Sequence, residues 1–141
     1  MKLSKQAKTP EKLFIELVHI MQKLRGKHGC PWDKHQTHKT LLPYLFSEAN
    51  ELKQALKKED WENTAEELGD VLLQVVFHSQ VAKENGRFTI SDVIRSINQK
   101  LIRRHPHVFA GVKVKDADAV IKQWDEIKRQ EKLKKKLSSR G

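Results

Sequence analysis

Two pairs of carboxylates, each spaced by three residues, constrain the fold of this chain more than any other feature. Glu48 and Glu51 form the first pair, and Glu67 and Asp70 form the second. Residues three apart project from nearly the same side of an α-helix, so each pair directs two carboxylates toward one point. Two antiparallel helices joined through residues 57–60 would bring all four acids together. The spacing therefore predicts a helical hairpin that carries a concentrated acidic site.

Such a site favours a bound cation. Ionised carboxylates are not stable neighbours in a partly dry groove without an opposite charge, and Mg²⁺ is the common divalent cation with oxygen ligands. The alternative is two solvated acidic helix faces, because Glu is frequent on protein surfaces. Glu48 lies on the same side as Leu45 and Leu52, which favours the site. A di-iron bundle needs Glu-x-x-His in two helices, a requirement that this sequence does not meet.

Composition indicates one helical domain. The chain has 141 residues, and its few Gly and Pro residues stand at apparent element ends. No apolar run is long enough to span a bilayer, and the Lys-containing N-terminus lacks the apolar segment of a secretory signal. Cys30 is the only cysteine, so no internal disulfide can form. These features predict a cytoplasmic protein.

Charge is distributed unevenly along the chain. The net charge is +10, yet residues 48–70 contain eight acids and three Lys. Residues 128–140 contain seven Lys or Arg and one acid. A basic protein with an acidic centre suggests a metal site surrounded by groups that hold an anion. We expect the basic tail to be a solvated, fraying helix end, with nucleic-acid contact as the alternative.

Helical periodicity and capping residues predict five helices. The first starts at Thr9-Pro10 and ends at Gly26 and Gly29, and the second begins near Thr40 with Pro43 in its first turn. The third spans about 61–83, the fourth runs from residues 89–91 to Pro106, and the last starts near residue 116 and dissolves from residue 128. We expect an all-α fold, a compact bundle of about four core helices plus a C-terminal helix with a basic tail. The expected divisions are an N-terminal extension (1–9), the domain (10–127) and the tail (128–141).

Three further features carry functional interpretations: a basic cluster, a tryptophan and a glycine. Lys100, Arg103 and Arg104 recur at the end of the fourth helix, more densely than dipole complementation requires, and these side chains suit phosphate oxygens. Trp124 is either a core residue or a stacking surface for a base. Gly69, between the acids of the second pair, suggests a close neighbour that needs room.

Four segments resemble the MazG nucleoside triphosphate pyrophosphohydrolases of the all-α NTP pyrophosphatase superfamily. The segments are GCPWDKHQT, SEANE, EELGDVLLQVVFH and KLIRRHPHVF, and the resemblance extends over residues 13–124. It implies an α-helical fold, a homodimer and dependence on Mg²⁺, with Mn²⁺ as a substitute. It also implies hydrolysis of NTPs or dNTPs to the monophosphate and pyrophosphate, as in housecleaning of the nucleotide pool.

The same resemblance implies residue roles. Glu48, Glu51, Glu67 and Asp70 match the metal ligands through which catalysis proceeds. The substrate-binding residues that it implies are Lys100, Arg104 and Trp124, and we add Arg103 from its place in the basic cluster. Many family members carry Glu and Tyr at the positions of Ser47 and Asn50. The alternative function is a catalytically weak helical module that binds nucleotide or nucleic acid through its basic surface. Base and sugar preference, the phosphorus attacked and the number of metal ions stay open.

Overall fold

Every regular element of the described chain is a helix. The computed structural model describes residues 8–139, in which no strand occurs, and the all-α prediction is confirmed. The helices are α1 (Pro10–Leu24), α2 (Pro31–His35), α3 (His38–Lys57), α4 (Trp61–Glu84), α5 (Ile90–Arg104), α6 (Pro106–Phe109) and α7 (Ala117–Ser139). None of the described helices is long and apolar enough to cross a membrane.

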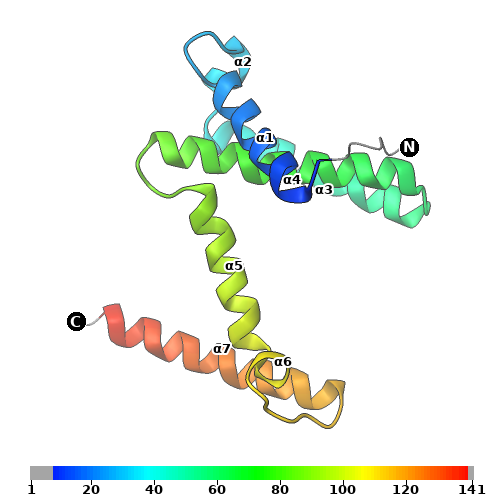
Figure 1. The fold of residues 1–141 in the computed structure, drawn as a ribbon, viewed down its shortest axis with the longest axis vertical. Helices are drawn as coiled ribbons and strands as arrows, with labels where there is room; N and C mark the ends of the chain where they lie inside the picture. The colour runs from blue at the N-terminus through cyan, green and yellow to red at the C-terminus, as the bar shows by residue number, and fades with distance from the viewer. Residues whose placement is uncertain (1–7, 140–141) are drawn as a thin grey trace. The chain divides into compact units, whose positions relative to one another are not determined.

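The chain divides into two units, Met1–Ile90 and Ser91–Gly141. The first holds α1 to α4 and the second holds nearly all of α5 together with α6 and α7 (Figure 1). The domain boundaries expected after residues 9 and 127 stay predictions, and most of the expected N-terminal extension lies outside the described residues.

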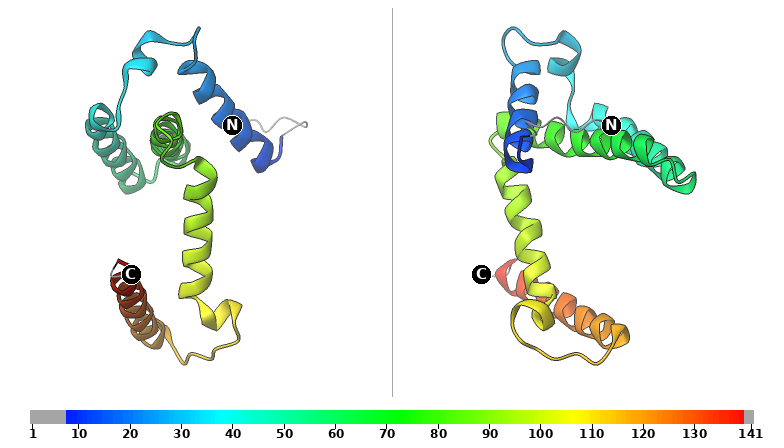
Figure 2. Two further views of the ribbon diagram at one scale, coloured as in Figure 1. Left: turned by 90° about the vertical axis from the view of Figure 1, so that its left-hand side faces the viewer. Right: turned by 45° about the vertical axis from the view of Figure 1, so that its right-hand side comes forward.

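The α3–α4 hairpin is the main structural element of the first unit. The two helices run side by side in opposite directions (Figures 1 and 2). Asp60 ends the connection and caps α4, because its carboxylate accepts a hydrogen bond from the Asn63 amide at 3.2 Å. The predicted hairpin is therefore present, with its turn where the sequence places it.

The start of α3 differs from the expected one. Thr37 is the N-cap and forms a reciprocal capping box with Thr40, so the helix begins at His38 instead of near Thr40. Pro43 consequently lies inside the helix and not in its first turn, and that expectation is wrong. Because proline has no N–H, the Lys39 carbonyl loses its usual helical donor.

The core of the first unit lies between α1, α3 and α4. Its buried members are Met21, Leu41, Val76, Phe77 and Val81. On α1 the buried side is centred on Met21, which is 1% exposed, whereas Leu13 and Ile20 are exposed. The other α1 side chains that pack against this core are Phe14, Leu17, Val18 and Leu24.

Arg25 organises the connection between α1 and α3. Its guanidinium donates to the carbonyls of Asp33 and Gln36, at 2.5 and 3.0 Å, and to the Glu84 carboxylate at 2.7 Å. These bonds hold the short helix α2 near the C-terminal end of α4. Trp32 packs edge-on against Tyr44 and Phe77, yet it remains 49% exposed.

In the second unit, α7 is longer than expected. The sequence predicts that the helix dissolves from residue 128, but α7 continues to Ser139, so that expectation is wrong. Lys, Glu, Gln and Leu are good helix formers, and they make up most of this segment. An ion pair between Glu126 and Arg129, one turn apart, adds local support.

Candidate functional site

Three carboxylates converge on the α3–α4 hairpin. Oxygen atoms of Glu48, from α3, and of Glu67 and Asp70, from α4, all lie within 4.8 Å of one another. The antiparallel arrangement causes this, since residue numbers rise along α3 as they fall along the adjacent face of α4. The i, i+3 spacing of Glu67 and Asp70 turns both toward α3.

Crowding changes the acidity of this cluster. Burial raises the pKa of Glu48, and the charges of Asp70 and Glu51 add to the effect. Burial likewise raises the pKa of Glu67, followed by the charges of Glu51, Asp70 and Glu48. Glu51 is therefore an electrostatic neighbour of both, although it does not belong to the group within 4.8 Å. The four predicted acids do come together in the first unit.

Two oxygen atoms of the cluster have no hydrogen-bond partner within residues 8–139. Glu48 Oε2 and Glu67 Oε2 are both buried, and each lacks a donor. A buried acceptor left unpaired is unfavourable, and more so when it is charged. A divalent cation with oxygen ligands would satisfy both atoms and offset the repulsion, so the donor set fits Mg²⁺ or Mn²⁺.

A di-iron centre fits less well. It requires Glu-x-x-His on two helices of a bundle. The chain contains one such motif, Glu16 to His19 on α1. Neither residue belongs to the acidic cluster, which contains carboxylates alone.

The polar edge of α4 continues beyond the acids. Gln74 is 5% exposed, and its Oε1 has no partner in the described chain. One turn further, His78 Nδ1 lies 2.8 Å from His38 Nδ1 of α3. The contact between His38 and His78 joins residues 40 apart in the chain, so no local sequence pattern predicts it; it depends on the register of the hairpin.

Gly69 does not face a close neighbour in the described chain. Apart from its chain neighbours and the adjacent backbone of α4, no described atom lies within 4 Å of the position that a Cβ would take. The expectation that Gly69 makes room for tight packing within the chain is therefore wrong.

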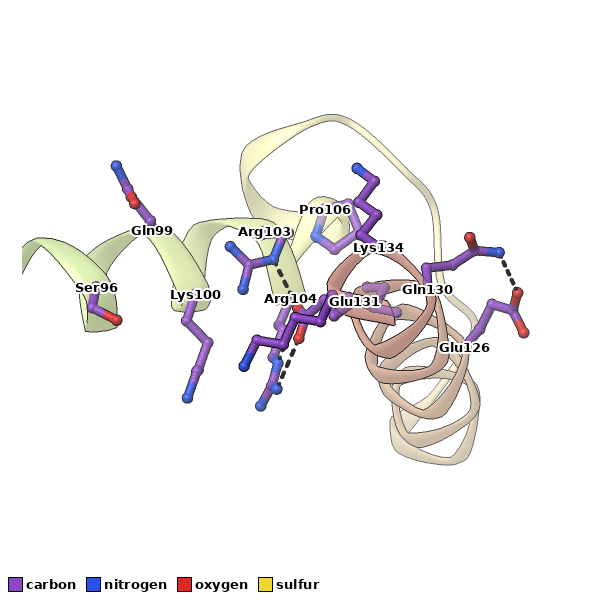
Figure 3. A pocket seen from close by; sticks show the side chains of 12 residues that line it. Ser96, Gln99, Lys100, Arg103, Arg104, Pro106, Glu126, Gln130, Glu131 and Lys134 are labelled. Carbon is purple, nitrogen blue, oxygen red and sulfur yellow. Dashed lines mark hydrogen bonds and ion pairs between the residues drawn. The ribbon is translucent and has the colours of Figure 1, made fainter. Parts of the chain in front are cut away.

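The predicted basic cluster lies in the second unit. Lys100, Arg103 and Arg104 line a cavity of about 750 Å³ between α5 and α7 (Figure 3). Arg103 Nε donates to Glu131 Oε1 at 2.7 Å, and Arg104 Nη2 donates to Oε2 of the same carboxylate at 3.1 Å. These two arginines lower the pKa of Glu131 to about 2. The sequence analysis did not single out Glu131, although it is the one acid in a basic segment.

Trp124 lies on α7 close to this cluster. Its ring meets the His105 ring at a steep angle, with the centroids 5.3 Å apart. Trp124 lines a second, smaller cavity together with Lys100 and Arg104. Its Nε1 is buried and has no acceptor in the described residues. A partly buried indole beside cationic side chains is compatible with both interpretations of Trp124.

Fold and site together define a class of protein, an all-α chain with a carboxylate cluster suited to a divalent cation and a separate cationic cavity. The chain belongs to the MazG nucleotide pyrophosphohydrolase domain family, whose model matches residues 36–109. That match includes the four acids, Lys100, Arg103 and Arg104, but neither Trp124 nor Glu131.

Curated relatives support the same family. The chain is 57% identical over 129 residues to a nucleoside triphosphate pyrophosphohydrolase/pyrophosphatase MazG of Thermotoga maritima, covering 92% of this chain and 49% of that protein. It is 46% identical to a nucleoside triphosphate pyrophosphohydrolase of Escherichia coli, covering 84% of this chain and 46% of that protein. The chain thus spans about half the length of these relatives.

A solved structure also matches. The crystal structure of a mazG-related protein from Thermotoga maritima has a TM-score of 0.68 and 31% sequence identity, covering 82% of this chain and 98% of that one. The resemblance drawn from the four sequence segments is confirmed at the level of family and fold.

Proposed function

We propose that this chain catalyses the Mg²⁺-dependent hydrolysis of nucleoside triphosphates, NTPs or dNTPs, to the nucleoside monophosphate and pyrophosphate. The observation that carries the proposal is the acidic cluster, with three carboxylates within 4.8 Å and two buried oxygen atoms that lack a partner in the described chain. The names of the relatives from Thermotoga maritima and Escherichia coli point to the same activity.

Each group of residues has a part in this proposal. Glu48, Glu51, Glu67 and Asp70 hold the cation, with Mn²⁺ as a substitute for Mg²⁺. When bound, the cation supplies neutralisation of phosphate charge and Lewis-acid activation of water. Substrate binding is assigned to the cationic side chains of α5 and the indole of α7: Lys100, Arg103, Arg104 and Trp124. Fixed cations neutralise the phosphate charge that the metal leaves uncompensated.

A homodimer in the cytoplasm is part of the proposal. Large apolar side chains are exposed on the hairpin, among them Phe46 at 72% and Trp61 at 65%. Extended exposed apolar surface is typical of an interface, and a symmetric dimer would use the same surface twice. Light scattering at micromolar concentration tests the dimer, and a stable monomer would contradict it.

The proposed biological role of the hydrolysis is the removal of unwanted nucleotides from the pool.

The experiment is an assay of pyrophosphate and nucleoside monophosphate over a panel of NTPs and dNTPs, with Mg²⁺ or with a chelator. We expect release of both products with Mg²⁺ and none with the chelator. Glu67→Gln should abolish the release without loss of helicity by circular dichroism. Full activity of Glu67→Gln would remove the acidic cluster from the mechanism.

The alternative is a catalytically weak module that binds nucleotide or nucleic acid through its basic surface. One observation favours it, the continuation of α7 through the Lys-rich segment, where Lys132, Lys135 and Lys136 line a shallow hollow. Binding of single-stranded and duplex oligonucleotides over a salt series tests it. Affinity that falls steeply with salt, in a protein that shows no hydrolysis, would favour the module.

A further inference from the structure

The two arginines of the cationic cavity already hold an anion, and it belongs to the protein. Arg103 and Arg104 are consecutive on α5, yet both guanidinium groups reach the Glu131 carboxylate on α7 (Figure 3). Guanidinium groups bind carboxylate and phosphate in the same forked geometry. The Glu131 carboxylate therefore occupies the place where a phosphate group would bind these two arginines.

The neighbouring cations are not neutralised in this way. Lys100 is one turn before Arg104 and extends from α5 in the same direction (Figure 3). No ion pair of Lys100 is found within residues 8–139, and the same is true of Lys134 and Lys135, which line the cavity from α7. The other acid of the cavity, Glu126, is bound by Arg129 and Gln130 on its own helix. The cavity thus keeps a surplus of positive charge after Glu131 is counted.

Exchange of the internal anion for an external one costs little. The side chains of Arg103, Arg104 and Glu131 are 50%, 26% and 21% exposed, so water reaches the ion pairs. Ion pairs that water can reach contribute little net stability, because solvent screens the attraction. A ligand that brings more negative charge than one carboxylate can displace Glu131 and also engage Lys100.

We propose that Glu131 is a specificity-determining residue, an internal counter-anion that a pyrophosphate or triphosphate group displaces from Arg103 and Arg104 and that a single phosphate group displaces poorly. A lone phosphate gains from the arginines about what the carboxylate gives up. A chain of phosphates gains the unpaired lysines as well. The cavity then selects the polyphosphate substrate over the monophosphate product.

The inference rests on the proposed function for its biological substrate, but its test does not need hydrolysis. Inorganic phosphate and inorganic pyrophosphate are titrated into the full chain by calorimetry, in chelator and at low salt. The variants are Glu131→Gln and, as a control of equal charge change on the same helix, Asp125→Asn. Asp125 does not line the cavity.

In the unmodified protein we expect pyrophosphate to bind more tightly than phosphate. Glu131→Gln should bind both ligands more tightly, by about two- to tenfold, the affinity equivalent of partly exposed ion pairs, with the larger gain for phosphate. Asp125→Asn should leave the ratio of the two affinities unchanged. Lys100→Gln should weaken pyrophosphate more than phosphate.

Two results would overturn the inference. Weaker pyrophosphate binding by Glu131→Gln would mean that the carboxylate holds the arginines in place, and equal gains in Glu131→Gln and Asp125→Asn would reduce the effect to net charge. If Glu131→Gln loses helicity, Glu131→Asp keeps the charge and shortens its reach, and the same direction is expected. An absence of NTP hydrolysis, with the predicted binding pattern intact, would reject only the proposed function.

Discussion

The Nδ1 atoms of His38 and His78 lie 2.8 Å apart, and their rings are almost parallel, with an interplanar angle of 2°. One ring must donate and the other accept, so this bond cannot survive with both rings protonated. The pair joins α3 to α4 on the same side of the hairpin as the acidic cluster, and His78 Nε2 is buried without a partner in the described chain. The contact between α3 and α4 thus requires that at least one of the two imidazoles be neutral.

This contact predicts a loss of stability in mild acid. Burial lowers the pKa of His78, and the neighbouring His38 lowers it further. The unfolded chain then binds the proton more readily than the folded one, so the stabilisation is complete above the ordinary histidine pKa of about 6.5. It is lost as pH falls through the lower folded pKa. We expect the Tm of the unmodified protein to fall between pH 7 and pH 5 by several degrees more than that of His78→Gln; equal falls would contradict the assignment.

The acidic cluster predicts opposite effects of one substitution with and without metal. Because burial and neighbouring charges raise the pKa of Glu67, its ionised form is disfavoured in the fold, and this penalty grows as pH rises through the folded pKa. Glu67→Gln should therefore raise the Tm in chelator.

With Mg²⁺ at 100 times its Kd, the unmodified protein should gain about 2.7 kcal/mol of stability, and Glu67→Gln should gain little. Thermal denaturation in both conditions, with Glu62→Gln as a control on the first turn of α4, measures the effect. A Tm of Glu67→Gln that rises with Mg²⁺ as in the unmodified protein would exclude Glu67 as a ligand.

The proposed role of Arg104 in phosphate binding predicts that replacing it changes the kinetics of hydrolysis. If it stabilises the departing phosphate, Arg104→Ala should lower kcat as well as kcat/KM, by about 2–4 kcal/mol in transition-state stabilisation. If it binds ground and transition states equally, only KM should rise. Steady-state kinetics and the Tm are measured together, with Arg95→Ala as the control, since Arg95 lies on α5 and is exposed. Unchanged kinetics with a reduced Tm would leave Arg104 a purely structural role.

Local patterns predicted the α3–α4 hairpin and the convergence of its acids, but not the short helices α2 and α6. The i, i+3 spacing of Glu67 and Asp70, and the Asp60 cap before α4, depend on residues within one turn, and the sequence contains all the information needed. The start of α3 was misplaced because Thr37 and Thr40 are both residues typical of a helix N-cap. In the structure Thr37 is the N-cap, and Thr40 is its partner in the capping box. Contacts between helices could not be predicted in this way. The pairing of Glu131 with Arg103 and Arg104 depends on how α7 packs within its unit, which periodicity does not specify.

Gly69 gives a last prediction, which separates the isolated chain from an assembled one. The glycine lies inside α4, between two residues of the acidic cluster, and apart from its chain neighbours and the adjacent α4 backbone no described atom is within 4 Å of where its Cβ would be. Glycine inside a helix costs about 1 kcal/mol relative to alanine. If nothing else packs there in solution, Gly69→Ala should raise the free energy of unfolding by about that amount.

The contrasting variant is Gly29→Ala, whose Cβ would lie close to the Leu24 carbonyl oxygen and should destabilise the fold. Urea denaturation of both variants, with light scattering, makes the measurement. A Gly69→Ala protein that is less stable, and that also associates less, would show that a second molecule packs against α4 at this glycine.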